Sequence, residues 1–124
     1  MATIFSDIQL ILDAIAKKNG KIGSAPHGVF WRQTGNYDSD YTSFTTGEVP
    51  NFGLPIIDPA NPKDSNFFVI LINPNGVQGF PQMPAKGPFI TGADYQVTLT
   101  NGQTLTGHQI QETITNWLNN KYPK

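Results

Sequence analysis

The sequence predicts a mainly α-helical single domain that carries one β-hairpin. Three observations predict it: an apolar stripe at helical spacing near the N-terminus, a second such stripe near the C-terminus, and an alternating segment with an Asn-Gly turn before the second stripe. The chain of 124 residues has the length of one ordinary domain, so residues 1–124 are assigned to a single unit.

The first helix is predicted to start after Thr3, whose hydroxyl is expected to cap it. Asn19-Gly20 supplies a left-handed stop at its other end. Because apolar residues recur every three or four positions between these signals, one face of the helix is expected to be buried. The residues of this stripe are Ile4, Ile8, Ile11, Leu12 and Ile15.

The last helix is predicted to begin at a capping box, in which Thr106 and Gln109 satisfy each other's backbone donors. Each end helix has a single apolar face, so the two helices are expected to pack on each other. The apolar face of the last helix consists of Ile110, Ile114, Trp117 and Leu118.

A hairpin is predicted over residues 95–105, where Tyr95, Val97 and Leu99 alternate with polar residues before the turn at Asn101-Gly102. The segment 65–72 leaves two alternatives open. Its aromatic and β-branched residues favour a strand, whereas Asp64 or Ser65 would cap a short helix. Glycine and proline are concentrated in residues 19–92, which predicts a loop-rich middle.

Composition excludes several function classes. A formal charge of −1 with 14% charged residues argues against a nucleic-acid partner. The absence of cysteine excludes disulfides, thiolate metal sites and thioether-linked cofactors. No apolar run is long enough to span a membrane, so a soluble chain is expected, and the N-terminus as given lacks a signal-peptide pattern. The cellular compartment stays open.

The order of these features resembles a small bacterial c-type cytochrome. Between the two end helices lie Pro26-His27-Gly28, then a Pro- and Asp-containing stretch over 58–65, and then Met83-Pro84. The resemblance implies a cytochrome c-like fold in which His27 and Met83 would be the two axial ligands of a haem iron. Phe30 and Trp31, which follow the histidine, complete the candidate cofactor-binding set.

Two departures change what the resemblance implies. Gly23 and Pro26 stand where the family has its cysteines, so covalent haem attachment is chemically impossible. The hairpin is an insertion into the family plan. An empty haem pocket would be a costly void, so a haem-free chain is expected to fill it with its own side chains. The aromatic residues available for this are Phe30, Trp31, Tyr41, Phe44, Phe52, Phe67, Phe68, Phe80 and Phe89.

The sequence therefore predicts a non-catalytic module that acts in binding or assembly, most simply without a cofactor. The alternative is a one-electron carrier that holds haem non-covalently through His27 and Met83. No catalytic set is assigned, because Ser24 and His27 lack an orienting partner.

Asp38 and Asp40 lack the remaining residues of a calcium loop and are expected to lie in a solvated loop. His108 is expected to be exposed and to have no role. The expected partner is an unidentified protein or a second copy, bound along the hairpin edge. Tyr37, Tyr41 and Tyr95 are expected to be exposed contacts for a sugar or a peptide.

Overall fold

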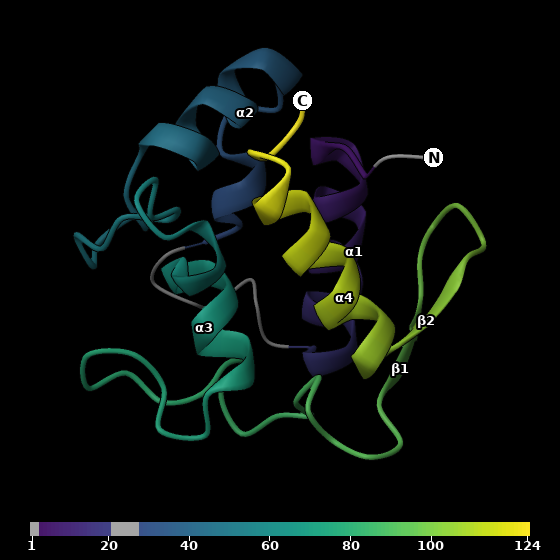
Figure 1. The fold of residues 1–124 in the computed structure, drawn as a ribbon. Helices are drawn as coiled ribbons and strands as arrows, with labels where there is room; N and C mark the ends of the chain where they lie inside the picture. The colour runs from purple at the N-terminus through teal and green to yellow at the C-terminus, as the bar shows by residue number, and fades with distance from the viewer. Residues whose placement is uncertain (1–2, 21–27) are drawn as a thin grey trace.

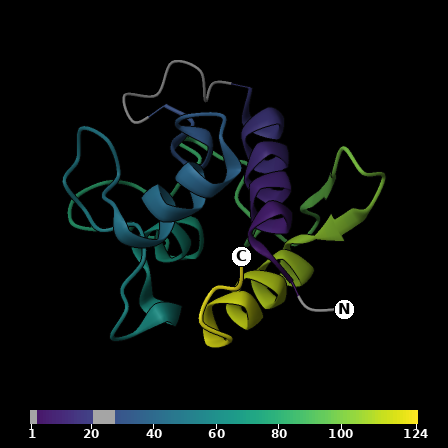
Figure 2. The same cartoon turned by 90° about the horizontal axis from the view of Figure 1, so that it is seen from above.

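The computed structural model describes residues 3–20 and 28–124, and in these ranges the chain is mainly helical, as predicted. The two ends of the chain form α1 and α4, and the hairpin lies on the opposite side of α1 from α2 and α3 (Figures 1 and 2). The α-helices are α1 (Phe5–Asn19), α2 (Tyr37–Thr46), α3 (Asn66–Ile72) and α4 (Gly107–Asn119); the strands are β1 (Gln96–Thr98) and β2 (Thr104–Thr106); the short 3₁₀ helices are η2 (Phe30–Arg32) and η3 (Pro62–Asp64).

Helix α1 ends where the sequence predicts but is capped by a different residue. Gly20 takes the left-handed conformation, with φ of 80°, and its N–H donates to the carbonyl of Ala16. The N-cap is Ile4 rather than Thr3, and the Asp7 side chain accepts the Ile4 N–H at 2.9 Å. The predicted Thr3 cap is therefore wrong, because the carboxylate of Asp7 satisfies this donor from inside the first turn.

Helix α4 begins with the predicted capping box. The Thr106 hydroxyl accepts the Gln109 N–H at 3.2 Å, and the Gln109 side chain accepts the Thr106 N–H at 2.9 Å. Gly107 lies directly against the Ile90 carbonyl, so that a Cβ at this position would stand 1.9 Å from the oxygen. Only glycine therefore allows the chain before the hairpin to lie against the start of α4.

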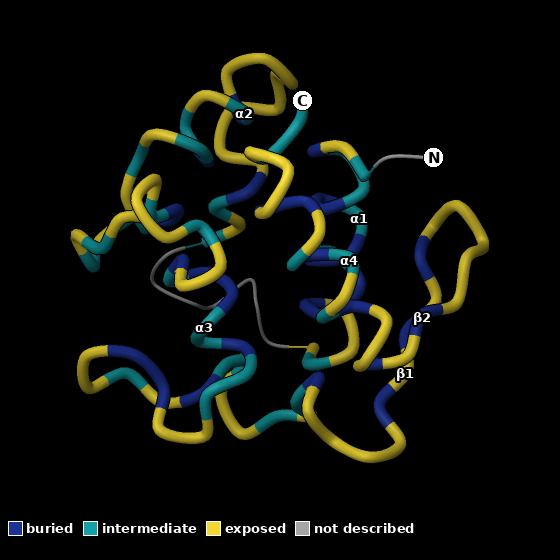
Figure 3. The backbone as a smooth tube through the Cα atoms, in the orientation of Figure 1, coloured by how far each residue is buried: buried dark blue, intermediate teal, exposed yellow. Residues whose placement is uncertain are grey.

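The two end helices meet through their aromatic residues, as predicted. The rings of Phe5 and Trp117 stack with centroids 6.2 Å apart, and both side chains are fully buried. Figure 3 shows buried segments where α1 and α4 cross and exposed ones around the hairpin turn. The other fully buried large apolar residues are Ile8, Ile11, Phe44, Ile56, Ile90, Ile110, Ile114 and Leu118.

The hairpin is confirmed, and it belongs to the core. Val97 pairs with Leu105 across an antiparallel register, and both are buried together with Tyr95 and Leu99. Tyr95 is only 5% exposed, so its predicted role as an exposed contact is wrong. The hairpin contributes these apolar side chains to the core, so deletion of residues 95–105 would expose α1 to water. Such a deletion could therefore not test whether the hairpin edge binds a partner, because it would also destabilise the fold.

The middle of the chain contains a helix that the sequence analysis missed. Residues expected to form a solvated loop around Asp38 and Asp40 belong to α2, and the Asn36 side chain caps it by accepting the Ser39 N–H at 3.0 Å. Asp40 is buried and its carboxylate accepts the N–H and hydroxyl of Thr34 at 2.7 and 2.8 Å. The solvated-loop prediction is therefore wrong for Asp40.

The ambiguous segment after Asp64 is a helix. Ser65 occupies the N-cap position of α3, but its hydroxyl bonds to Pro62 and Asp58 rather than to the helix. Phe67, Phe68 and Leu71 are buried along one side. The helical alternative holds because seven residues between the Ser65 turn and Pro74 suffice for two turns that bury this face.

Candidate functional site

The loop that contains Met83 is held against the ends of two helices. The Met83 N–H donates to the Ile70 carbonyl at 2.8 Å, and the buried Gln82 side chain donates to the Leu71 carbonyl at 2.9 Å. At the other end of the loop, the Asn19 amide donates to the Gly87 carbonyl at 2.8 Å. The ends of α3 and α1 therefore position the methionine.

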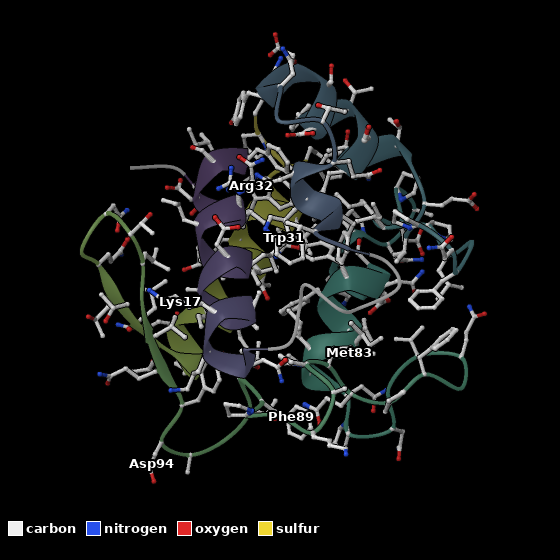
Figure 4. All side chains as sticks on the ribbon, turned by 180° about the vertical axis from the view of Figure 1, so that it is seen from behind. Lys17, Trp31, Arg32, Met83, Phe89 and Asp94 are labelled. Carbon is white, nitrogen blue, oxygen red and sulfur yellow. The ribbon has the colours of Figure 1, made fainter. Side chains whose placement is uncertain are left out.

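Trp31 is held against α1. Its indole N–H donates to Asp13 Oδ1 at 2.7 Å, and its carbonyl accepts the buried Gln9 amide at 2.8 Å. Asp13 also pairs with Arg32 through two oxygens, and this hydrogen bond is the main cause that raises the pKa of the guanidinium. Figure 4 shows Trp31 beside α1, whereas Met83 lies beside α3.

An apolar cavity of about 50 Å³ lies between Phe30 and Met83. Phe52 and Phe80 pack on each other in its lining, with ring centroids 4.7 Å apart. The one polar side chain in its lining, Asn66, donates its amide to the Pro55 carbonyl at 2.7 Å. The lining residues are Phe30, Val49, Phe52, Leu54, Asn66, Phe67, Ile70, Val77, Phe80 and Met83.

A haem does not fit this cavity. Pockets for drug-sized ligands measure about 300–1,000 Å³, and this space is much smaller because four phenylalanine rings line it. The site therefore offers an apolar surface of side-chain dimensions. Among the described lining residues, Asn66 is the one polar side chain that could contact an occupant.

The structure brings some of the predicted site residues together. Phe30 and Met83 line the same cavity, although 53 residues separate them in the chain. Trp31 does not belong to this lining and is buried against α1 instead. His27 lies outside the described residues.

The remaining sequence candidates lie apart from this cavity. His108 is exposed, as predicted, and pairs with Glu112 at 2.8 Å on the surface of α4. Among the described residues, no group of three or more histidine and acidic side chains is placed to hold a metal ion. Within the same ranges, no helix has the length and apolar character needed to cross a bilayer.

Three residues that position the site were missed. Asn19 was interpreted only as a helix stop, and Gln82 and Gln9 were not singled out. A signal for Gln9 is present in the sequence, since it adjoins the apolar stripe of α1. No local pattern marks Gln82, because its partners lie 9 and 11 residues away along an irregular loop.

Comparison of the chain with family models, curated proteins and solved structures finds no match. The geometry of the site is thus the basis for a functional proposal.

Proposed function

We propose that this chain is a haem-free, non-catalytic binding module with a cytochrome c-like layout, and that its apolar cavity receives one aliphatic side chain of a protein partner. The observation that carries the proposal is the cavity of about 50 Å³ between Phe30 and Met83. In the family that the sequence resembles, the residues at the positions of His27 and Met83 would hold a haem, and Met83 lies in the lining of this cavity.

The size and chemistry of the cavity support a side chain as the occupant. A cavity of about 150 Å³ is known to hold benzene, so a space one third as large suits the end of a leucine, isoleucine or methionine. Among the described lining residues, Asn66 supplies the one polar side chain, and it donates an N–H to the Pro55 carbonyl. Because the other described lining residues are apolar, apolar contact is the main driving force for binding.

The rigid setting of Met83 also supports this proposal. Hydrogen bonds to Ile70 and from Asn19 hold the loop at both ends, so the cavity wall is formed before a partner arrives. A preformed pocket loses less conformational entropy on binding than a flexible one.

Xenon is a suitable probe for the cavity because it is apolar and of side-chain size. We expect xenon pressure to cause saturable NMR shifts at the methyl groups of Met83, Leu54 and Ile70. The variant Ile70→Phe fills the space and should abolish these shifts. Leu10→Phe, at a half-buried position outside the lining, is the matched control. Shifts that survive in Ile70→Phe contradict the proposal.

The second candidate function is one-electron transfer through a non-covalently bound haem. It is favoured by the fact that Phe30, in the segment following His27, and Met83 line one cavity. It requires the four phenylalanine rings of the lining to move apart, because a haem does not fit the space between them. Titration with haemin separates the two functions. A stoichiometric Soret band that weakens in both His27→Ala and Met83→Ala supports the carrier, whereas the absence of a saturable band supports the module.

A further inference from the structure

A second cleft lies under the hairpin, on the other side of α1 from the cavity described above. Its volume is about 250 Å³. Figure 1 shows the hairpin turn beside the first turns of α1. The lining residues come from three elements and from the segments next to them: Thr3, Asp7 and Ile11 at α1, Leu99, Gln103 and Leu105 at the hairpin, and Thr113 from α4.

The cleft combines an apolar surface with a polar rim. Ile11, Leu99 and Leu105 are each buried to more than nine tenths, and they supply the apolar part. Hydroxyl and amide groups from Thr3, Gln103 and Thr113 stand in the rest of the lining. Asp7 is the one charged residue of the set, so the cleft carries a negative charge.

Asp7 has one oxygen available for a ligand. Its Oδ2 accepts the Ile4 N–H at 2.9 Å, and no described residue donates to Oδ1. The N–H groups of Ile4, Ser6 and Asp7 at the start of α1 already have acceptors, which are the Asp7 side chain, the Tyr37 hydroxyl and the Ile4 carbonyl. This helix start therefore offers little to an anion, and the free carboxylate oxygen favours a cation.

We propose that this cleft binds a small organic amine. The ammonium group donates to Asp7 Oδ1, and the apolar body of the amine lies on Leu99 and Leu105. The volume equals roughly eight waters in the liquid, which suits a compact molecule such as phenethylamine. This inference is independent of the function proposed for the Met83 cavity, because the two sites share no residue.

NMR titration of the full chain tests the proposal with three ligands of similar size and shape that differ in charge. Phenethylamine is expected to cause saturable shifts at the methyl groups of Ile11, Leu99 and Leu105. The neutral 2-phenylethanol and the anionic phenylacetate should bind at least about tenfold more weakly, because each lacks the charge-assisted hydrogen bond. Equal binding of the alcohol, or no saturable shift with the amine, overturns the proposal.

Variants assign the binding to Asp7. Asp7→Asn keeps an oxygen for the Ile4 N–H but removes the charge, and it should weaken amine binding about tenfold. Asp64→Asn, at an exposed position far along the chain, is the matched control and should bind as the unchanged protein does. An equal loss in both variants contradicts the role of Asp7.

A gain-of-affinity variant keeps the test valid if Asp7→Asn weakens the fold. Gln103→Glu adds a second carboxylate at an exposed position of the cleft, so amine binding should strengthen and become more sensitive to salt. Unchanged affinity in this variant counts against the proposal. A blocked lysine carries the same ammonium on a larger body. If the blocked lysine binds more tightly than phenethylamine, the cleft is a site for a lysine side chain of a protein partner, and the proposal of a small amine ligand is wrong.

Discussion

Single residues in this chain acquire their roles from partners that lie far away in sequence. Trp31 was predicted as a cofactor contact because it is aromatic and follows His27, yet its indole donates to Asp13, 18 residues earlier. Phe30, its neighbour, does line the cavity. Sequence reasoning assigned both to one candidate cofactor-binding set but could not assign the directions of their side chains, because these depend on packing against α1.

Tyr95 is the residue whose environment is least favourable. Its hydroxyl is buried and has no hydrogen-bond partner in the described part of the chain, and burial raises its pKa to about 12. Lys18 lies over the ring at 5.4 Å from its centroid, which compensates through a cation–π contact without satisfying the hydroxyl. An unsatisfied buried hydroxyl costs about 1–3 kcal/mol.

The first prediction is that Tyr95→Phe stabilises the protein by roughly 1 kcal/mol at neutral pH, because it removes the unsatisfied hydroxyl and keeps the ring. Urea unfolding followed by circular dichroism measures the change. Tyr41→Phe is the matched control and should destabilise, since the Tyr41 hydroxyl donates to the Tyr122 carbonyl at 2.6 Å. A less stable Tyr95→Phe would show that the hydroxyl has a partner.

The second prediction concerns the pH dependence of the same tyrosine. Its pKa is about 12 in the folded chain and about 10 in the unfolded one, so the unfolded chain loses the proton first as pH rises. Stability is therefore intact below pH 10 and declines between pH 10 and 12, by about 3 kcal/mol at most. The difference in unfolding free energy between the unchanged protein and Tyr95→Phe, measured from pH 10 to pH 12, isolates the contribution of Tyr95 ionisation. A constant difference contradicts it.

At the scale of elements, local signals were predicted well and non-local ones were missed. The capping box of α4, the Gly20 stop of α1 and the hairpin turn each depend on residues within a few positions of one another. Helix α2 was missed because its serine and threonine residues have modest helix propensity and few apolar residues mark a face. Its one buried aromatic residue, Phe44, stabilises it through tertiary packing.

The third prediction tests the capping box. Thr106→Ala removes the hydroxyl that accepts the Gln109 N–H, and it should cost about 1 kcal/mol of unfolding free energy. Thr106→Ser keeps the acceptor and should recover most of the loss. Thr100→Ala, at an exposed position next to the hairpin turn, is the control. Equal losses for Thr106→Ala and Thr100→Ala would mean that the cap contributes nothing.

At the scale of the whole molecule, one aromatic cluster joins α1, α2 and α3, and its member Phe67 also lines the cavity. The Phe44 ring lies 4.9 Å from that of Phe67 and 5.4 Å from that of Phe5, measured between centroids. These contacts connect α2, α3 and α1. The sequence predicted that aromatic residues of the loop-rich middle would fill the interior. It could not predict which rings contact one another, because these contacts join residues that lie far apart in the chain.

This arrangement separates phenylalanines that hold the fold from those that shape the cavity. Phe44 is fully buried, whereas Phe52 is half-buried in the cavity lining. Phe44→Ala should therefore cost about 3–5 kcal/mol, a large share of the roughly 5–15 kcal/mol that stabilises a typical domain. Phe52→Ala removes a ring that still contacts water, so it should cost only about 1 kcal/mol.

Urea unfolding and the xenon titration together measure this last prediction. Phe44→Ala should lower the unfolding midpoint strongly and broaden the NMR signals of α2 and α3, because both helices lose their shared contact. Phe52→Ala should keep a dispersed spectrum but weaken xenon binding, since it removes one of the two rings that pack together in the cavity lining. If the two variants lose similar stability, or if Phe52→Ala binds xenon unchanged, the cavity is not a separate feature built on an independent core.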